Sequence, residues 1–95
     1  MITQEQKNII IEVMKPYHPK KIGIFGSFAR GENSENSDID ILYEEEGKLS
    51  LFDHIKILNT LKKHLNLEVD LVTTNALHPL LKSQILNDLK VIYES

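Results

Sequence analysis

Acids and isoleucines alternate in the run DIDILY, from Asp38 to Tyr43, and this pattern constrains the fold more than any other part of the chain. Successive side chains of a β-strand point to opposite faces. A strand here would therefore place Asp38 and Asp40 together on one face, with the isoleucines in the core on the other. Two carboxylates side by side repel each other, and such a pair usually shares a cation or a proton.

The remaining segments alternate between helical and extended patterns. Thr3 and Gln6 have the spacing of a capping box, which predicts a helix at residues 4–15. Ser50 and Asn75 are predicted to cap two further helices. Strands are predicted at 21–25, 38–43, 68–73 and from residue 89, a helical turn at 27–30, a loop at 31–37 and a charged turn at 44–48. The predicted inner faces are Leu51, Ile55, Leu58, Leu61 and Leu65 after the first of these caps, and Leu77, Leu81 and Ile85 after the second.

This order predicts an α/β (α+β) fold, a small mixed β-sheet of about four strands covered by helices. A chain of 95 residues suits a single domain, residues 1–95. The net charge of −3 argues against a broad surface for direct DNA or RNA binding. The absence of cysteine excludes disulfides and thiolate metal sites. With no signal-peptide pattern and no apolar run of about eighteen residues, a cytoplasmic protein without membrane contact is expected.

A third acid stands in a comparable place. Asp70 lies between Val69 and Leu71 in another predicted strand. If this strand is a neighbour of the DIDILY strand, Asp70 can face the same point as Asp38 and Asp40. Ligand sets made only of oxygen suit Mg²⁺. Three acids around two ions about 3.5–4 Å apart are the arrangement of two-metal phosphoryl and nucleotidyl transfer.

Gly26 and Ser27 follow the first predicted strand and open the helical turn. Backbone N–H groups at such a turn bind anions, and glycine lets a phosphate come close. The Ser27 hydroxyl can add a hydrogen bond. Arg30 could also contact phosphate, although a structural role is favoured, in which it pairs with a nearby acid or a loop carbonyl. The segment therefore offers a phosphate cradle, followed ten residues later by acids that suit a metal.

The stretch GSFARGENSENSDIDIL, which begins at Gly26, is similar to the signature of the DNA polymerase β-like nucleotidyltransferase superfamily: Gly-Ser, ten residues, then Asp-x-Asp. The small size resembles the minimal nucleotidyltransferase (MNT) domains of that superfamily, and the likeness covers nearly the whole chain. It implies a polymerase β-like core in which Asp38 and Asp40 bind catalytic Mg²⁺, as two ions, and Asp70 completes the site. Gly26 and Ser27 would hold the triphosphate of ATP.

Many MNT proteins are antitoxins paired with a HEPN-domain toxin, and the resemblance implies such a partner here. The implied reaction transfers AMP from ATP to a hydroxyl, a tyrosine of the toxin. Two alternatives stay open. One is a non-catalytic antitoxin that neutralises its toxin by complex formation, and the other is nucleotidyl transfer to a small molecule with help from another subunit. Apolar helix faces could serve a homo-oligomer or the HEPN partner equally well.

Overall fold

In residues 1–47 and 49–95, which the computed structural model describes, four strands form one mixed sheet. The strands are β1 (Pro19–Phe25), β2 (Ile39–Glu45), β3 (Val69–Thr73) and β4 (Lys90–Glu94). Their order across the sheet is β3-β2-β1-β4. β1 is antiparallel to β2 and to β4, whereas β2 and β3 run parallel and are joined through a helix. The predicted mixed sheet of about four strands is confirmed.

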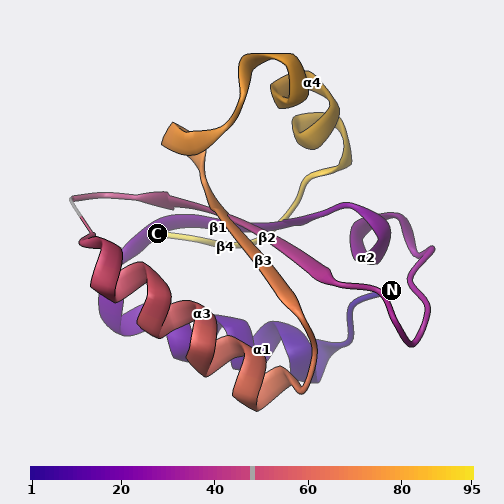
Figure 1. Ribbon diagram of the computed structural model, residues 1–95, viewed down its shortest axis with the longest axis horizontal. Coiled ribbons are helices and arrows are strands. Elements are labelled where there is room, and N and C mark those ends of the chain that lie inside the picture. Colours follow the sequence, from indigo (N-terminus) through magenta and orange to yellow (C-terminus); the bar gives the residue numbers. More distant parts are fainter. Residues whose placement is uncertain (48) are drawn as a thin grey trace.

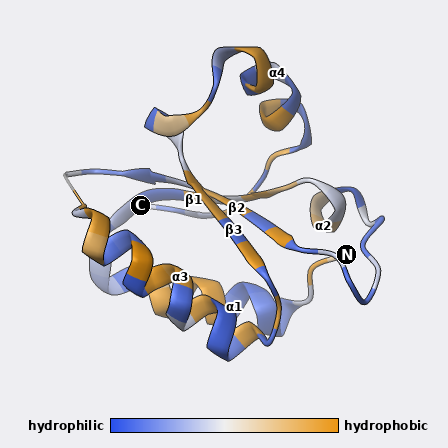
Figure 2. Cartoon of the chain, in the orientation of Figure 1, coloured by the Kyte–Doolittle hydropathy of each residue, from blue (hydrophilic) through white to orange (hydrophobic). Residues whose placement is uncertain are grey.

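The described residues also form four helices: α1 (Gln4–Met14), α2 (Ser27–Arg30), α3 (Leu51–Leu65) and α4 (Pro79–Asp88), with short 3₁₀ turns at Lys15–Tyr17 and Thr74–Ala76. α1 and α3 lie together on one face of the sheet, and α4 stands over the other face (Figure 1). Hydrophobic and hydrophilic residues alternate along both α1 and α3 (Figure 2), as expected of helices that cover a core with one side and meet water with the other.

The core lies between the sheet and the two helices α1 and α3. Its fully buried larger side chains are Ile10, Met14, Ile22, Ile24, Ile39, Ile41, Tyr43, Ile57 and Leu61. Both isoleucines of the DIDILY run are therefore in the core, as the alternation predicts. The capping box of Thr3 and Gln6 is also present and starts α1.

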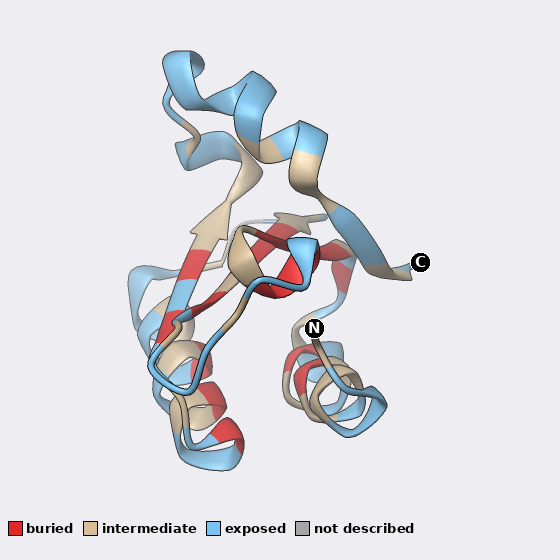
Figure 3. Cartoon of the chain, turned by 90° about the vertical axis from the view of Figure 1, so that its right-hand side faces the viewer, coloured by how far each residue is buried: buried red, intermediate tan, exposed pale blue. Residues whose placement is uncertain are grey.

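The opposite face of the sheet has a thinner cover. α4, all of whose residues are described, contains no buried residue. Figure 3 shows this contrast, with buried segments in the strands and along α1 and α3 but none in α4. The prediction of Leu77, Leu81 and Ile85 as core positions is wrong: Leu81 is 52% exposed, and the other two are half-buried. These side chains border a cleft instead of packing into the core.

The start of α4 also differs from the prediction. Asn75 lies in a 3₁₀ turn and does not cap the helix. α4 begins four residues later at Pro79, after the N-cap residue His78, whose Nδ1 accepts a hydrogen bond from the backbone N–H of Leu80 at 3.1 Å. Proline suits the first helical position because the N–H that it lacks would have no intrahelical partner there. The helix is therefore shorter than predicted.

The charged turn predicted at residues 44–48 is also shorter in the structure. Glu44 and Glu45 belong to β2, where they pair with β1. Lys48 lies outside the described residues. Within the described residues, no helix is both long enough and apolar enough to cross a membrane.

The inner face of α3 was predicted correctly only in its second half. Ser50 caps the helix as expected, and its hydroxyl accepts a hydrogen bond from the N–H of Asp53 at 3.1 Å. Ile57 and Leu61 are buried, but Ile55 is 44% exposed. Ile55 precedes Leu61 by six residues, which places it about 120° away around a helix of 3.6 residues per turn. Leu51, in the first turn, is 72% exposed.

Leu61→Ala is expected to lower the free energy of unfolding by about 2–5 kcal/mol, because it opens a cavity at a fully buried position. Ile55→Ala, on the same helix, is expected to lower it by only about 0.5 kcal/mol, because Ile55 is 44% exposed and lies outside the core. Urea denaturation followed by circular dichroism measures both values. Equal losses in the two variants would contradict this placement of the core.

Candidate active site

The parallel pairing of β2 with β3 places two acids side by side. Asp40 of β2 is the register partner of Asp70 of β3, and Phe25 is its partner on β1. Ile39 and Ile41, the neighbours of Asp40 along the strand, are buried in the core. Because alternate residues of a strand face opposite sides, both acids project from the sheet face that α1 and α3 do not cover.

These two acids line a cleft of about 450 Å³ that lies between the sheet and α4. Gly26 and Arg30 border the same cleft near the acids. On the α4 side, the lining includes the apolar side chains Leu77, Leu81 and Ile85. The cleft therefore has a charged wall on the sheet and a largely apolar wall on α4.

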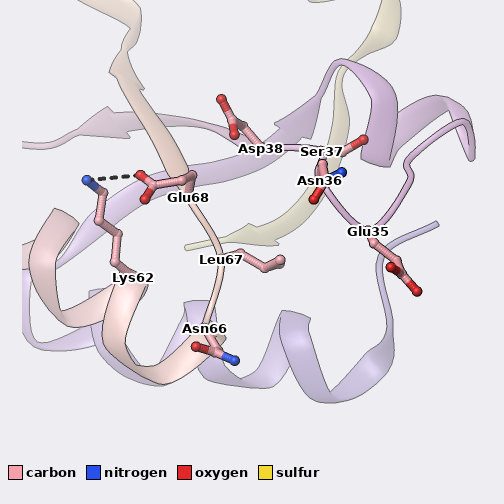
Figure 4. Close-up of a pocket in the computed structure, with 8 residues that line it drawn as sticks. All are labelled: Glu35, Asn36, Ser37, Asp38, Lys62, Asn66, Leu67 and Glu68. Atoms are coloured by element: carbon pink, nitrogen blue, oxygen red, sulfur yellow. Dashed lines mark ion pairs between the residues drawn. The ribbon is translucent and has the colours of Figure 1, made fainter.

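Asp38 lies one residue before β2 and borders a neighbouring hollow rather than the cleft. Figure 4 shows this hollow, of about 380 Å³, between the loop that carries Ser37 and the start of β3, with the ion pair of Lys62 and Glu68 at 3.3 Å on its edge. Ser37 orders the loop, because its Oγ accepts a hydrogen bond from the N–H of Ser34 at 2.8 Å. The side chain of Asp38 is exposed and open to an approaching ion or substrate.

The surroundings of Asp40 change how readily its carboxyl binds a proton. Partial burial raises the pKa of the Asp40 carboxyl from 3.8 to about 6, and the charges of Asp70 and Asp38 contribute in the same direction. Arg30 acts against this rise. Asp40 thus binds a proton more readily than an ordinary carboxylate, and a cation placed beside it would relieve the same repulsion.

Gly26 allows the turn between β1 and α2 to contact Asp40. Its backbone has φ 73° and ψ −152°, a conformation that residues with a side chain rarely adopt. A Cβ atom at this position would lie 2.2 Å from Oδ2 of Asp40, far inside van der Waals contact. Ser27 then begins α2, and the first N–H groups of a helix have no intrahelical acceptor. Free backbone donors therefore follow directly after the residue that touches Asp40.

Arg30, the last residue of α2, forms two ion pairs. Its Nη1 lies 2.6 Å from Oδ2 of Asp88 at the end of α4, and its Nε lies 3.4 Å from Oε2 of Glu32. The hydrogen bond to Asp88 is the main cause that raises the pKa of Arg30. The structural role favoured for Arg30, pairing with a nearby acid, is thus present. Contact with a phosphate stays a prediction.

The oxygen donors of the site suit a hard cation but do not form a closed cage. Asp38, Asp40 and Asp70 supply only carboxylate oxygens, the donors that Mg²⁺ prefers. Among the residues that the structure describes, no three His, Cys, Asp or Glu side chains converge closely enough to hold an ion. Mg²⁺ commonly takes one or two carboxylates and fills its other positions with phosphate oxygens and water. The acids therefore fit an ion that binds together with a nucleotide.

The contribution of α4 to the cleft was missed by sequence reasoning. The helical spacing predicts a core position for Leu81 and no role for Asp88, although both residues line the cleft. Only the tertiary arrangement brings α4 opposite the acids. One signal for Asp88 was available: an acid stands at the C-terminal end of a helix, where the helix dipole disfavours a negative charge.

Comparison with known proteins relates this geometry to an established family. Residues 7–95 match the family model described as Polymerase beta, Nucleotidyltransferase. The proposed protein adenylyltransferase MJ0435 of Methanocaldococcus jannaschii is 47% identical over 89 residues, which cover 93% of this chain and 95% of that protein. Protein adenylyltransferase MntA of Thermococcus cleftensis is 38% identical over 82 residues, with 81% of this chain and 83% of that protein covered. A chain in the crystal structure of a toxin–antitoxin with AMP-PNP matches with a TM-score of 0.82 and 28% identity, over 94% of this chain and 73% of that one.

Asp40→Asn is expected to stabilise the metal-free protein at about pH 7. Because the folded-state pKa of about 6 exceeds the ordinary value, the folded state binds more protons than the unfolded state between about pH 4 and 6, and stability falls as the pH rises through that window. Solvent reaches part of this carboxyl, so we expect a gain of about 1 kcal/mol, below the roughly 3 kcal/mol to which the full rise in its pKa corresponds. Thermal unfolding with a chelator measures it.

The gain from Asp40→Asn should disappear below about pH 4, where the carboxyl is protonated in both states. Glu46→Gln, which removes one exposed acid outside the cleft, serves as the control for the loss of a carboxylate as such. A gain of the same size at about pH 3 would mean that the substitution acts through something other than the charge of Asp40.

Gly26→Ala is expected to lower the free energy of unfolding by about 1–3 kcal/mol, because the added Cβ atom meets Asp40 in a strained backbone conformation. Gly47→Ala is the matched control, since a Cβ atom there would meet no described residue other than its chain neighbours within 4 Å. Urea denaturation of both variants makes the comparison. If Gly26→Ala is as stable as Gly47→Ala, the close approach of residues 26 and 40 is wrong.

Proposed function

The chain belongs to the polymerase β nucleotidyltransferase family, and on that premise we propose that it transfers AMP from ATP to a hydroxyl group of another protein. The proposed acceptor is a tyrosine of a HEPN-domain toxin, which makes this chain the antitoxin of the pair. The observation that carries the proposal is the pairing of Asp40 with Asp70 in a cleft that Gly26 also lines. Relatives named protein adenylyltransferases and a structural neighbour from a toxin–antitoxin with AMP-PNP support the choice of donor and acceptor.

The cleft has the size and the chemistry for a nucleotide. Its volume of about 450 Å³ is within the usual range for small-molecule sites. In the proposal, backbone N–H groups after Gly26 and the hydroxyl of Ser27 bind the triphosphate, and Arg30 adds a positive charge at the same end. The apolar wall of α4, with Leu81 and Ile85, is left for the nucleoside.

Asp38, Asp40 and Asp70 are the residues that would hold Mg²⁺, as two ions. Bound there, Mg²⁺ would neutralise the triphosphate and stabilise the departing pyrophosphate. The raised pKa of Asp40 supports this role, because it reflects a carboxylate disfavoured by burial and by the charges of Asp70 and Asp38, and a bound cation would relieve both.

The chain's own residues then mainly position the reactants. The acceptor oxygen attacks the α-phosphorus in line with the bond to the bridging oxygen, and that bond breaks as pyrophosphate leaves with the electron pair. In the proposal a carboxylate oxygen of Asp70 takes the proton of the acceptor hydroxyl. Asp70 is exposed, so a tyrosine presented by another protein can reach it. We further propose that residues 1–95 act as one domain in the cytoplasm.

The experiment that tests this function uses ATP labelled at the α-phosphate, Mg²⁺, this protein and the product of the adjacent gene. The wild-type protein is expected to label the partner. The double variant Asp38→Asn/Asp40→Asn is expected to reduce labelling by more than about 100-fold, because even outer partners of metal ligands contribute up to that much. Glu46→Gln also replaces an acid by its amide, but at an exposed position outside the cleft, and it should label the partner as strongly as the wild type does.

The other outcomes distinguish the alternatives. If the two proteins form a tight complex but no label is transferred, the chain neutralises its toxin by binding, and the proposal of AMP transfer is wrong. Labelling that persists in the double variant would show that these acids do not carry the reaction. Labelling of neither protein, with no complex, would remove the toxin as acceptor and make small-molecule acceptors the next class to test.

A further inference from the structure

α4 forms a wall of the cleft, yet little apolar packing holds it in place. None of its residues is buried, and Leu80, Leu81 and Leu86 are 85%, 52% and 45% exposed. In proteins, most of the stability of a helix comes from packing an apolar face, and α4 lacks a buried face. The position of α4 over the sheet must therefore depend on its chain connections and on a small number of specific contacts.

One such contact joins the end of α4 to the end of α2. Oδ2 of Asp88 lies 2.6 Å from Nη1 of Arg30, although the two residues are 58 positions apart in the sequence. The Asp88 side chain is only 24% exposed. A charge-assisted hydrogen bond of this length is among the stronger polar contacts in proteins. Both residues line the cleft.

Asp88 is not explained by the needs of its own helix. The C-terminal end of a helix carries a partial negative charge, so a carboxylate there is unfavourable. The last turn of α4 contains no basic residue that could offset it. The guanidinium of Arg30, on a different helix, supplies that positive charge. The acid at position 88 therefore serves the contact between α4 and α2.

Arg30 in turn connects α4 to the acids on the sheet. Arg30 lines the same cleft as Asp40 and Asp70. α2, which Arg30 ends, begins directly after Gly26, which leaves no room for a Cβ atom beside Asp40. The ion pair thus links the α4 wall of the cleft to its charged wall on the sheet.

We propose that Asp88 is a positioning residue, which sets the distance of α4 from the sheet through its ion pair with Arg30 and so controls how tightly the cleft holds a nucleotide. The identity of the ligand rests on the proposed function; the placement of α4 does not. Asp88 acts through α4 and Arg30 rather than on the reacting atoms. Its loss therefore affects nucleotide affinity and leaves the transfer step of the bound nucleotide nearly unchanged.

Calorimetric titration with AMP-PNP and Mg²⁺ tests the effect on affinity. Asp88→Asn is expected to bind about five- to tenfold more weakly than the wild type, with kcat at saturating ATP within about twofold. Asp88→Glu retains the carboxylate and should recover most of the affinity. Glu32→Gln is the matched control. It also removes one negative charge and one ion-pair partner of Arg30, but the ion pair of Glu32 with Arg30 does not involve α4.

Hydrogen exchange without nucleotide tests the placement of α4 by itself. The amides of residues 80–88 are expected to exchange faster in Asp88→Asn than in the wild type or in Glu32→Gln. Arg30→Gln should speed the exchange of the same amides. The double variant Arg30→Gln/Asp88→Asn should not speed it further, because each substitution breaks the same ion pair.

The outcomes separate this inference from the proposed function. A wild-type protein that binds no AMP-PNP would remove the proposed function, while faster exchange in Asp88→Asn would still support the placement of α4 by Asp88. Exchange in Asp88→Asn equal to that of the wild type would overturn the inference. So would an affinity for AMP-PNP that is unchanged or tighter in Asp88→Asn, or a loss confined to kcat.

Discussion

Repulsion between carboxylates held together by the backbone is the constraint on which the charged face of this molecule depends. The register of β2 and β3 brings Asp40 beside Asp70, and the side chains cannot move apart by shifting the strands. A shift by one residue would expose Ile39 and Ile41, which the core holds on the other face. Burial of the isoleucines on one face of the sheet thus holds the repelling carboxylates close together on the other face.

The two faces of the sheet have different roles: one stabilises the fold, and the other carries the candidate site. The face under α1 and α3 is closely covered by aliphatic side chains and supplies the stability of the fold. The other face carries the acids, the Gly26 turn and a helix that does not pack into the core. A cleft can exist there because the first face already secures the strands. The alternation of side chains along β2 places the acids, which would destabilise a core, on the face of the sheet away from it.

Local patterns in the sequence were sufficient for much of the fold. The alternation of the DIDILY run, the capping box at Thr3 and the turn at Gly26 depend on residues close together in the chain, and each was predicted. The rotation of α3 about its axis was not. Ile57 rather than Ile55 faces the sheet because tertiary packing selects among apolar positions that have similar local spacing.

The site was predictable in its residue types but not in its contacts. The sequence indicated that Gly26 and Asp40 belong to one site, yet their close approach follows from the register of β1 against β2. The helical spacing of Leu81 suits a core residue, and only the position of α4 shows that it faces a cleft. The pairing of Arg30 with Asp88 spans 58 residues and has no local signature apart from an acid at the unfavourable end of a helix.

The lack of buried residues in α4 has a consequence for how such proteins can diverge. Mutations in a buried core are usually rejected because they destabilise the fold, whereas mutations at exposed positions are mostly neutral. α4 therefore offers a cleft wall whose sequence can drift at little risk to folding. Descendants of one scaffold could acquire new ligand preferences by point mutations in this helix, while the opposite face of the sheet stays the same.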